Sequence, residues 1–269
     1  LAERAGELGA ATTVRATHAL APAPDDGVGA AIGRALHLAG LPLARVVTRL
    51  AELGDGALGP RELPVLADLV CPGGTPRGQV EPGQRYEAVR SLLAILSRER
   101  PVILWLDDAV CDLEALGLAQ HVLTSQADDP LSVLVVLTVQ DELLEGRTDA
   151  RAALDRLAGR AEVETIALSA LAPEEHSLLV RRLLPLTPAA SSQVEIRTAG
   201  SPSFAIAVIG DWVESGVLEH GATGFRLREG VGTSAPPSVA DAWSERVERL
   251  LAREPEPARV AIELAAACG

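Results

Sequence analysis

The order of hydrophobic segments predicts an α/β fold, in which helices cover a parallel sheet. Two apolar runs, residues 101–106 and 131–138, show almost no alternation with polar residues. Runs of this kind are buried on both faces, as the central strands of a parallel sheet are. Segments with helical spacing lie before, between and after them, and alternating strands and helices are the pattern of a parallel sheet covered by helices.

The elements of the first 170 residues follow this alternation. Residues 1–9 are typical of the end of a helix closed by Gly9, and the apolar spacing at 27–53 is interrupted by Pro42, which predicts two helices there. Gly and Pro are dense at 70–84, which predicts a loop. The remaining expected elements are strands at 11–17, 101–106, 131–138 and 163–168, and helices at 85–100, 112–125 and 149–157.

From residue 173 onward the alternation stops and helices dominate, so we place a domain boundary near residue 170. A hairpin is expected at 217–228, around Gly221 and Gly224. Helices are expected at 173–184, 189–197, 203–215, 238–253 and 257–268.

The composition excludes several classes of function. The chain has 269 residues, no Lys and a net charge of −13. Without Lys, no P-loop lysine, Schiff base or lysine general base can act from within these residues. The excess of acids argues against a nucleic-acid surface and against a polybasic membrane contact. Direct DNA binding is therefore not expected, even from residues 217–269.

Neither membrane insertion nor a structural metal is expected. No apolar run approaches the length that spans a bilayer. Cys71, Cys111 and Cys268 are odd in number and far apart, which excludes a disulfide framework and a C-x-x-C metal site. The five His residues form no pair with metal-ligand spacing. We therefore expect a reducing, cytoplasmic setting.

Two acids, Asp107 and Asp108, directly follow the first apolar run. In open α/β sheets ligands bind at the carboxyl ends of the strands. A carboxylate at that edge can hold Mg²⁺ against nucleotide phosphates, and its neighbour can orient or deprotonate an attacking water. The alternative is that the two acids only end a strand and cap the following helix.

Several segments, taken in order, resemble the STAND branch of P-loop ATPases. More closely, they resemble the AAA-type ATPase module of large bacterial regulators, which include LuxR-type transcriptional activators and proteins with a linked Ser/Thr kinase or cyclase domain. Residues 100–112 (RPVILWLDDAVCD) resemble its Walker B segment, and residues 131–141 (LSVLVVLTVQD) resemble its sensor-1 strand. Residues 166–184 resemble the turn into its helical lid, 198–218 the lid helix with a Gly-x-Pro motif, and 236–250 with 261–269 the winged helix and the start of a further module.

This resemblance implies a site for ATP and Mg²⁺. Asp107 would organise Mg²⁺ through water, and Asp108 would be the second catalytic acid. Thr138 and Gln140 would lie near the phosphates, while Gly200 and Pro202 would lie near the adenine. The alternative for Gly200 and Pro202 is a turn that starts a helix. The implied domains are a nucleotide-binding core at 1–170, a helical lid at 171–216 and a winged-helix-like segment at 217–269.

The sequence departs from the family pattern in three places. The Gly-rich P-loop with its Lys is absent, so we expect a chain truncated just after the phosphate cradle. Gln140 stands where many relatives carry Arg, and Val110-Cys111 stand where the family has His-Trp. These departures are consistent with a slow or regulatory ATPase, and we expect these 269 residues alone to be inactive.

Two functions follow from this reading. The first is a regulatory ATP-binding switch in a multidomain bacterial signalling or transcription regulator. Its partners would be the nucleotide and the other domains of the same chain, with nucleotide-dependent oligomerisation as an option. The second is a non-catalytic interaction scaffold derived from an ATPase, for which Gln140 and Val110-Cys111 would mark decay of the site.

Overall fold

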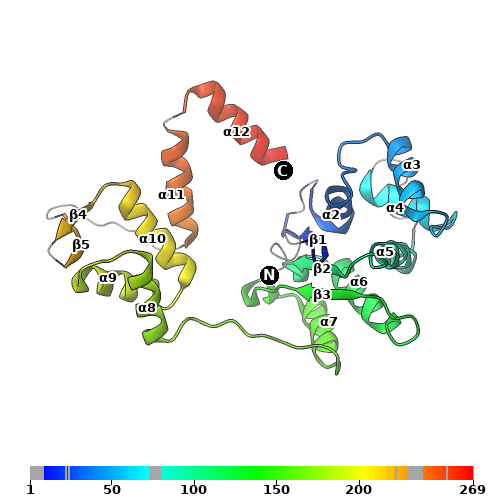
Figure 1. Ribbon diagram of the computed structural model, residues 1–269, viewed down its shortest axis with the longest axis horizontal. Helices are drawn as coiled ribbons and strands as arrows, with labels where there is room; N and C mark the ends of the chain where they lie inside the picture. The colour runs from blue at the N-terminus through cyan, green and yellow to red at the C-terminus, as the bar shows by residue number, and fades with distance from the viewer. Residues whose placement is uncertain are drawn as a thin grey trace. The chain divides into compact units, whose positions relative to one another are not determined.

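The computed structural model describes residues 9–21, 23, 25–72, 80–221, 223–228, 239–252 and 254–268. Most of the helix expected at 1–9 and much of the loop expected at 70–84 lie outside these ranges. The chain divides into two compact units, Leu1–Thr165 with Ala267–Gly269, and Ile166–Ala266 (Figure 1). We describe each unit by itself.

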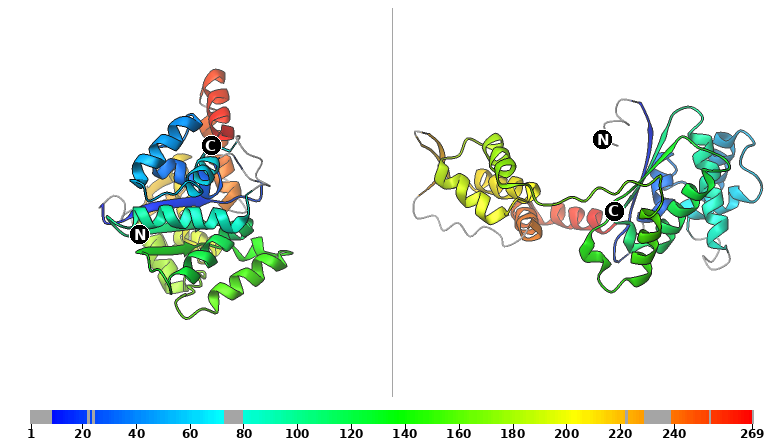
Figure 2. Two further views of the ribbon diagram at one scale, coloured as in Figure 1. Left: turned by 90° about the vertical axis from the view of Figure 1, so that its right-hand side faces the viewer. Right: turned by 90° about the horizontal axis from the view of Figure 1, so that it is seen from below.

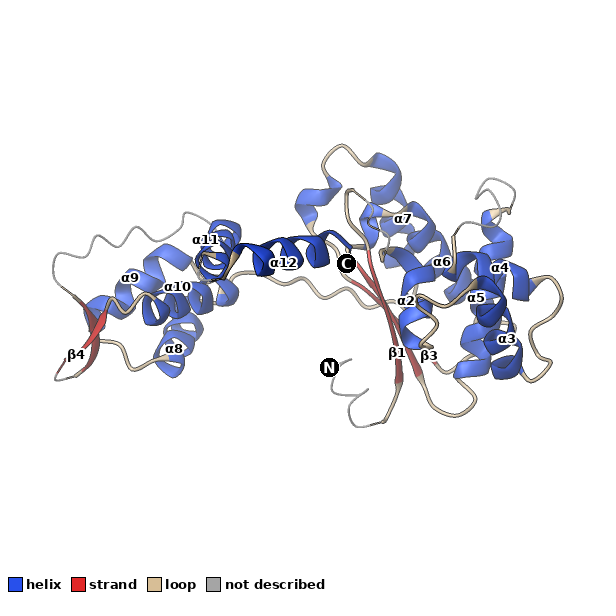
Figure 3. Cartoon of the chain, turned by 90° about the horizontal axis from the view of Figure 1, so that it is seen from above, coloured by secondary structure: helices blue, strands red, loops and turns tan. Residues whose placement is uncertain are grey.

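The first unit contains a three-stranded parallel sheet in the order β1-β2-β3 (Figure 3). Its strands are β1 Thr12–Thr17, β2 Val102–Asp107 and β3 Val133–Leu137. They confirm the strands expected at 11–17, 101–106 and 131–138. The register pairs Thr17 with Asp107 and Leu106 with Leu137, so the carboxyl ends of the three strands lie at one edge. The predicted α/β class with a parallel sheet is therefore confirmed.

Helices pack against this sheet and form a core with it (Figure 2). The side chains of Val14 on β1 and Leu104 on β2 are almost fully buried and face helices α2 (Gly27–Ala35) and α5 (Pro82–Leu96). Two helices flank Pro42, as predicted: the first ends at Ala35, and the second begins at Leu43 with Pro42 as its N-cap residue. The helices of this unit are α2 Gly27–Ala35, α3 Leu43–Gly54, α4 Glu62–Val70, α5 Pro82–Leu96, α6 Leu113–Ser125 and α7 Thr148–Ala158.

Two features around the expected loop differ from prediction. Helix α4, at Glu62–Val70, was not anticipated, because a proline interrupts its short apolar pattern. Helix α5 begins at Pro82 rather than at residue 85, with proline in its first turn, where the missing N–H is not needed.

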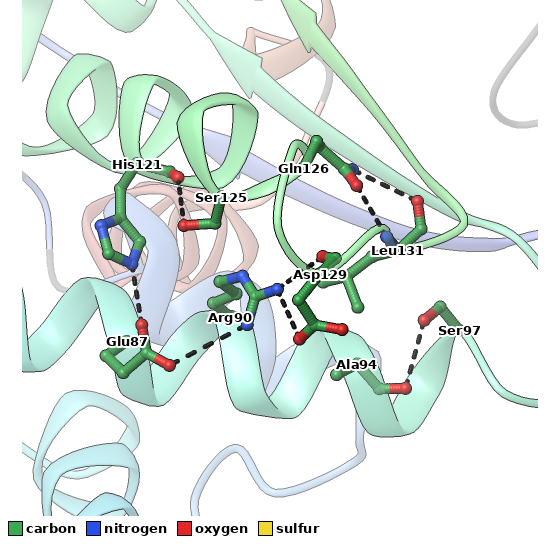
Figure 4. A network of polar contacts seen from close by, with 9 residues as sticks. All are labelled: Glu87, Arg90, Ala94, Ser97, His121, Ser125, Gln126, Asp129 and Leu131. Atoms are coloured by element: carbon green, nitrogen blue, oxygen red, sulfur yellow. Dashed lines mark hydrogen bonds and ion pairs between the residues drawn. The ribbon is translucent and has the colours of Figure 1, made fainter.

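A buried arginine ties α5 to the turn that leads into β3 (Figure 4). Arg90 is 7% exposed, and its Nη2 donates to the main-chain oxygen and to Oδ2 of Asp129, both at 2.7 Å. Next to it, Nε2 of His121 on α6 lies 3.0 Å from Oε2 of Glu87 on α5. Gln126 bonds the main chain of Leu131 through both ends of its amide. This network fixes the α6–β3 connection and therefore the start of β3.

The prediction of a strand at 163–168 is wrong. These residues have no regular secondary structure, and Ile166 and Leu168 are 74% and 94% exposed. An alternating apolar pattern forms a strand only when a neighbouring strand offers backbone donors and acceptors. Within the described residues, this segment has no such neighbour.

The second unit is mainly helical and has its own core. Trp212, Val208, Val194 and Val180 are its most buried large side chains. The antiparallel hairpin of β4 Leu218–Gly221 and β5 Gly224–Leu227 confirms the hairpin expected at 217–228. The expected helices are also present, as α8 Pro173–Leu183, α9 Pro188–Thr198, α10 Pro202–Glu214, α11 Val239–Leu251 and α12 Glu256–Cys268.

Across the described ranges of both units, no helix combines the length and the hydrophobicity that a bilayer crossing requires.

Candidate functional site

The carboxylate of Asp107 lies at the carboxyl end of β2 and accepts hydrogen bonds at both of its oxygens. The hydroxyl of Thr138, just after β3, donates to Oδ1. Nη2 of Arg15 on β1 donates to Oδ2 at 2.8 Å. The side chains of Arg15 and Asp107 are 45% and 25% exposed, so this ion pair lies at the surface of the sheet edge. Three neighbouring strands thus each contribute one group to the cluster.

The register of the sheet brings Arg15 to Asp107. Arg15 pairs with Trp105, and side chains paired in register project from the same face. Trp105 and Asp107 also share that face, because residues two apart on a strand do. The guanidinium of Arg15 lies over the Trp105 ring, 4.1 Å from its centroid, and from there reaches Asp107. The carboxylate therefore points away from the face that α2 and α5 cover.

Opposing effects act on the pKa of Asp107. Burial is the largest single effect and raises the pKa. The hydrogen bonds from Arg15 and Thr138, together with the positive charge of Arg15, act in the opposite direction and outweigh it. The pKa of Asp107 therefore lies below its usual value, and the group is ionised at neutral pH.

Asp108 adopts a left-handed backbone conformation, with φ 51° and ψ 42°. Non-glycine residues seldom adopt this conformation, and Asp and Asn do so most readily. The turn brings the Asp108 carboxylate to Gln140, whose Nε2 donates to both of its oxygens at 2.9 Å. The N–H of Asp108 also donates to Oγ of Thr138 at 3.2 Å. The structure thus brings together four of the predicted site residues, Asp107, Asp108, Thr138 and Gln140.

The alternative role of the two acids as helix caps does not hold. Helix α6 is capped by Asp112, whose Oδ1 accepts from the N–H of Glu114 at 2.9 Å. Neither Asp107 nor Asp108 makes a side-chain cap bond to a helix. Their carboxylates instead face groups that come from β1 and from the end of β3.

Two further residues of this region were missed by the sequence reasoning, Arg15 and His18. Nδ1 of His18 lies 2.9 Å from the main-chain oxygen of Asp107 and donates to it, since a carbonyl can only accept. His18 is 6% exposed. A His at the end of a strand, beside an acidic strand end, was the available signal, but the sequence does not reveal which strands are neighbours.

Gly200 and Pro202 belong to the second unit, and local contacts account for both. Gly200 has φ +85°, and a Cβ at this position would lie 2.7 Å from the carbonyl oxygen of Leu171. Its own carbonyl accepts from the N–H of Leu171 at 2.9 Å. Pro202 is in the first turn of α10, and the Ser201 hydroxyl caps that helix by accepting from Phe204 N–H. The turn that starts a helix is thus present, and adenine contact stays a prediction.

The oxygen atoms at this edge of the sheet are of the type that binds a hard cation such as Mg²⁺. Mg²⁺ is usually held by one or two carboxylates together with waters and phosphate oxygens, and Asp107 and Asp108 supply such groups. Within the described residues, no cluster of three or more His, Cys, Asp and Glu could hold a metal by itself. A cation that contacts Oδ2 of Asp107 would also have to replace Arg15 there.

Comparison with known proteins supplies no relative: no family model matches the chain, and neither a curated protein nor a solved structure is significantly similar to it.

Proposed function

We propose that this chain is the ATP-binding module of a regulatory ATPase in a multidomain bacterial regulator. The observation that carries the proposal is the cluster of Asp107, Asp108, Thr138 and Gln140 at the carboxyl ends of two adjacent parallel strands. Open α/β sheets bind their ligands at this edge. A pair of acids beside a hydroxyl and an amide is a set of groups suited to a nucleotide with its metal.

The proposed roles follow from these contacts. Asp107 would hold Mg²⁺ through water, and the bound ion would neutralise charge at the phosphates. Asp108, oriented by Gln140, positions a water molecule. Thr138 keeps Asp107 ionised and aimed at the edge. In the second unit, Gly200 and Pro202 form the turn proposed to contact adenine, within a helical lid followed by a winged-helix-like segment.

The open edge of β3 could accept a further strand, and that strand could carry the phosphate-binding loop. Within the described residues β3 pairs only with β2, and its apolar side chains are incompletely buried, with Leu134 54% exposed. A buried parallel strand normally has neighbours on both edges. We propose that a further strand, which carries a Gly-rich phosphate-binding loop, pairs at this edge. It would supply the N–H groups and the Lys that these residues lack.

A non-catalytic scaffold is the second candidate, and the Arg15–Asp107 pair favours it. The guanidinium already neutralises the carboxylate that would organise the metal. Gln140 brings no charge to the phosphates, and it too is occupied, by Asp108. In such a scaffold the polar groups at the sheet edge would serve to hold the strand ends together.

Two measurements on the full-length protein that contains these residues separate these functions. For an ATPase, calorimetry detects ATP·Mg²⁺ binding, and Asp107→Ala lowers hydrolysis on the order of 10²-fold or more, as removal of a major electrostatic group does. Asp155→Ala, an exposed acid on α7, is the matched control. No ATP affinity at millimolar concentration would establish the scaffold, and unchanged turnover of Asp107→Ala would refute the role of Asp107.

A further inference from the structure

A pocket of about 750 Å³ lies in the first unit, behind the sheet edge that carries Asp107. Segments of α2, α4, α5 and α6 line it, and these helices all belong to one unit (Figure 1). It also contacts His18 at the end of β1, on the side of the sheet that α2 and α5 cover. It is therefore separate from the Asp107 carboxylate, which points to the other face. Its volume is within the range of pockets that bind small molecules.

His18 lines this pocket and carries a buried, unpartnered acceptor. Because Nδ1 donates its hydrogen to the carbonyl of Asp107, the free nitrogen of the neutral ring is Nε2. Nε2 is buried and has no hydrogen-bond partner within the protein. A buried polar atom without a partner costs free energy, and native proteins satisfy nearly all such atoms. The atom is thus a candidate contact for a ligand.

A carboxylate oxygen faces Nε2 across the pocket wall. Oδ2 of Asp112 lies 4.0 Å from Nε2 of His18, which is too far for a direct hydrogen bond. Oδ1 of Asp112 is occupied by the N–H of Glu114, so Oδ2 is the oxygen directed at His18. When the imidazole is neutral, both atoms are acceptors. A donor group that contacts both would satisfy them together.

The charges of the residues that line the pocket indicate that this donor group is positively charged. The described lining contains four carboxylates and one guanidinium, and the guanidinium of Arg85 is paired with the carboxylate of Glu114. Two of the other acids are Asp112, whose Oδ2 faces Nε2 of His18, and Asp26, which accepts hydrogen bonds from the uncharged Thr17 hydroxyl and Ala23 N–H. An anionic ligand would be repelled here, and a cation would be attracted. This argues against a phosphate or a nucleotide in the pocket.

The remaining walls are apolar. Val28, Val65, Val89 and Leu118 come from four different helices and supply aliphatic surface. Tyr86 adds a phenol, and burial followed by the negative charge of Glu114 raises its pKa, so that it stays neutral at pH 7. Such a lining suits a compact hydrophobic body.

We propose that this pocket binds a small organic cation, an ammonium group on a compact apolar body. The ammonium donates to Nε2 of His18 and to Oδ2 of Asp112, and the apolar body packs between α2, α4, α5 and α6. The proposal requires no nucleotide, so it succeeds or fails independently of the ATPase function.

Three probes of similar shape and different charge test this on the 269-residue chain. They are benzylammonium, benzyl alcohol and benzoate, titrated at pH 8, above the ordinary pKa of His. We expect benzylammonium to bind in the millimolar range, as a fragment of this size does, and about tenfold more tightly than the alcohol. Benzoate should not bind. Long-range nitrogen–proton NMR should show the Nε2 resonance of His18 moving with benzylammonium alone.

Two variants locate the ammonium group. Asp112→Asn keeps a good helix cap but removes the charge, and should weaken benzylammonium about tenfold. His18→Leu should weaken it too and identifies the His18 resonance by its loss. The control Asp155→Asn removes an exposed charge outside the lining and should leave affinity unchanged. Equal binding of the three probes, an unmoved His18 resonance, or full affinity in Asp112→Asn would overturn the proposal.

Discussion

Replacement of Arg15 by Met tests whether the ion pair at the sheet edge sets the ionisation of Asp107. Met keeps an unbranched apolar side chain beside Trp105 but removes the guanidinium and its hydrogen bond. Burial then acts on Asp107 with less opposition, so the pKa of Asp107 should rise. Carbon-13 NMR of the Asp107 carboxyl group measures this rise directly.

The magnitude follows from the exposure of the two partners. Since Arg15 is 45% exposed and Asp107 is 25% exposed, solvent screens the pair strongly. Pairs of this kind contribute about 0.2–1 kcal/mol, and an exposed cation–π contact adds about 0.5–1 kcal/mol. We therefore expect Arg15→Met to lower the free energy of unfolding by about 1 kcal/mol at pH 7, which lowers the Tm by about 2–4 °C for a unit of this size.

The pH dependence separates the ion pair from simple packing. Because the pKa of Asp107 is lowered in the folded state, its contribution is fully present above the unfolded pKa of about 3.9. The contribution is lost as the pH falls through the folded pKa. The stability difference between the wild type and Arg15→Met should therefore shrink as the pH falls below about 4.

The control for this experiment is Arg49→Met on α3. Arg49 lies 3.8 Å from Glu52, with side chains 70% and 62% exposed, so its removal should change the free energy of unfolding by less than about 0.5 kcal/mol. A difference between wild type and Arg15→Met that is the same at pH 7 and at pH 3 would refute the electrostatic account of Asp107.

Three other substitutions probe the remaining contacts. Arg90→Leu removes two hydrogen bonds to the α6–β3 turn from a side chain that is 7% exposed. Urea denaturation should show that the free energy of unfolding falls by about 2 kcal/mol, and an unchanged midpoint would contradict the role of that network. Gly200→Ala places a Cβ 2.7 Å from the carbonyl oxygen of Leu171 at a φ of +85°. Thermal denaturation followed by circular dichroism should show that the free energy of unfolding falls by about 1–3 kcal/mol, and a fall near zero would show that the turn relaxes. Thr138→Val removes the donor to Oδ1 of Asp107, so carboxyl NMR should detect a higher Asp107 pKa, and a pKa that stays low would assign the effect to Arg15 alone.

The sheet and its polar edge could be predicted because they depend on local patterns. The uninterrupted apolar runs at 101–106 and 131–138 predict parallel strands, and the carboxyl ends of neighbouring parallel strands share an edge. That reasoning placed Asp107 and Asp108 at the edge, and the resemblance to the ATPase module added Thr138 and Gln140 near them. The hairpin at 217–228 was equally predictable from its glycines.

The partners of Asp107 depend on information that local patterns do not contain. Arg15 is 92 residues away, and it reaches Asp107 only because β1 pairs with β2 in a register that aligns Arg15 with Trp105. A shift of one residue would turn Arg15 to the opposite face. The expected strand at 163–168 failed for a related reason, because an alternating pattern does not say whether a pairing edge is within reach.

The imidazole of His18 is shared by the two faces of the sheet. One nitrogen bonds the main chain of Asp107, and the other is a buried acceptor without a partner in a residue that lines the pocket. Any ligand that draws the ring toward the pocket must therefore act on the peptide group that carries the Asp107 carboxylate. Thermodynamic linkage makes such coupling reciprocal, so a change in the charge state of Asp107 would alter the affinity of the pocket by the same factor. A titration of the pocket with benzylammonium in Asp107→Asn, which mimics the protonated carboxyl group, would measure that factor.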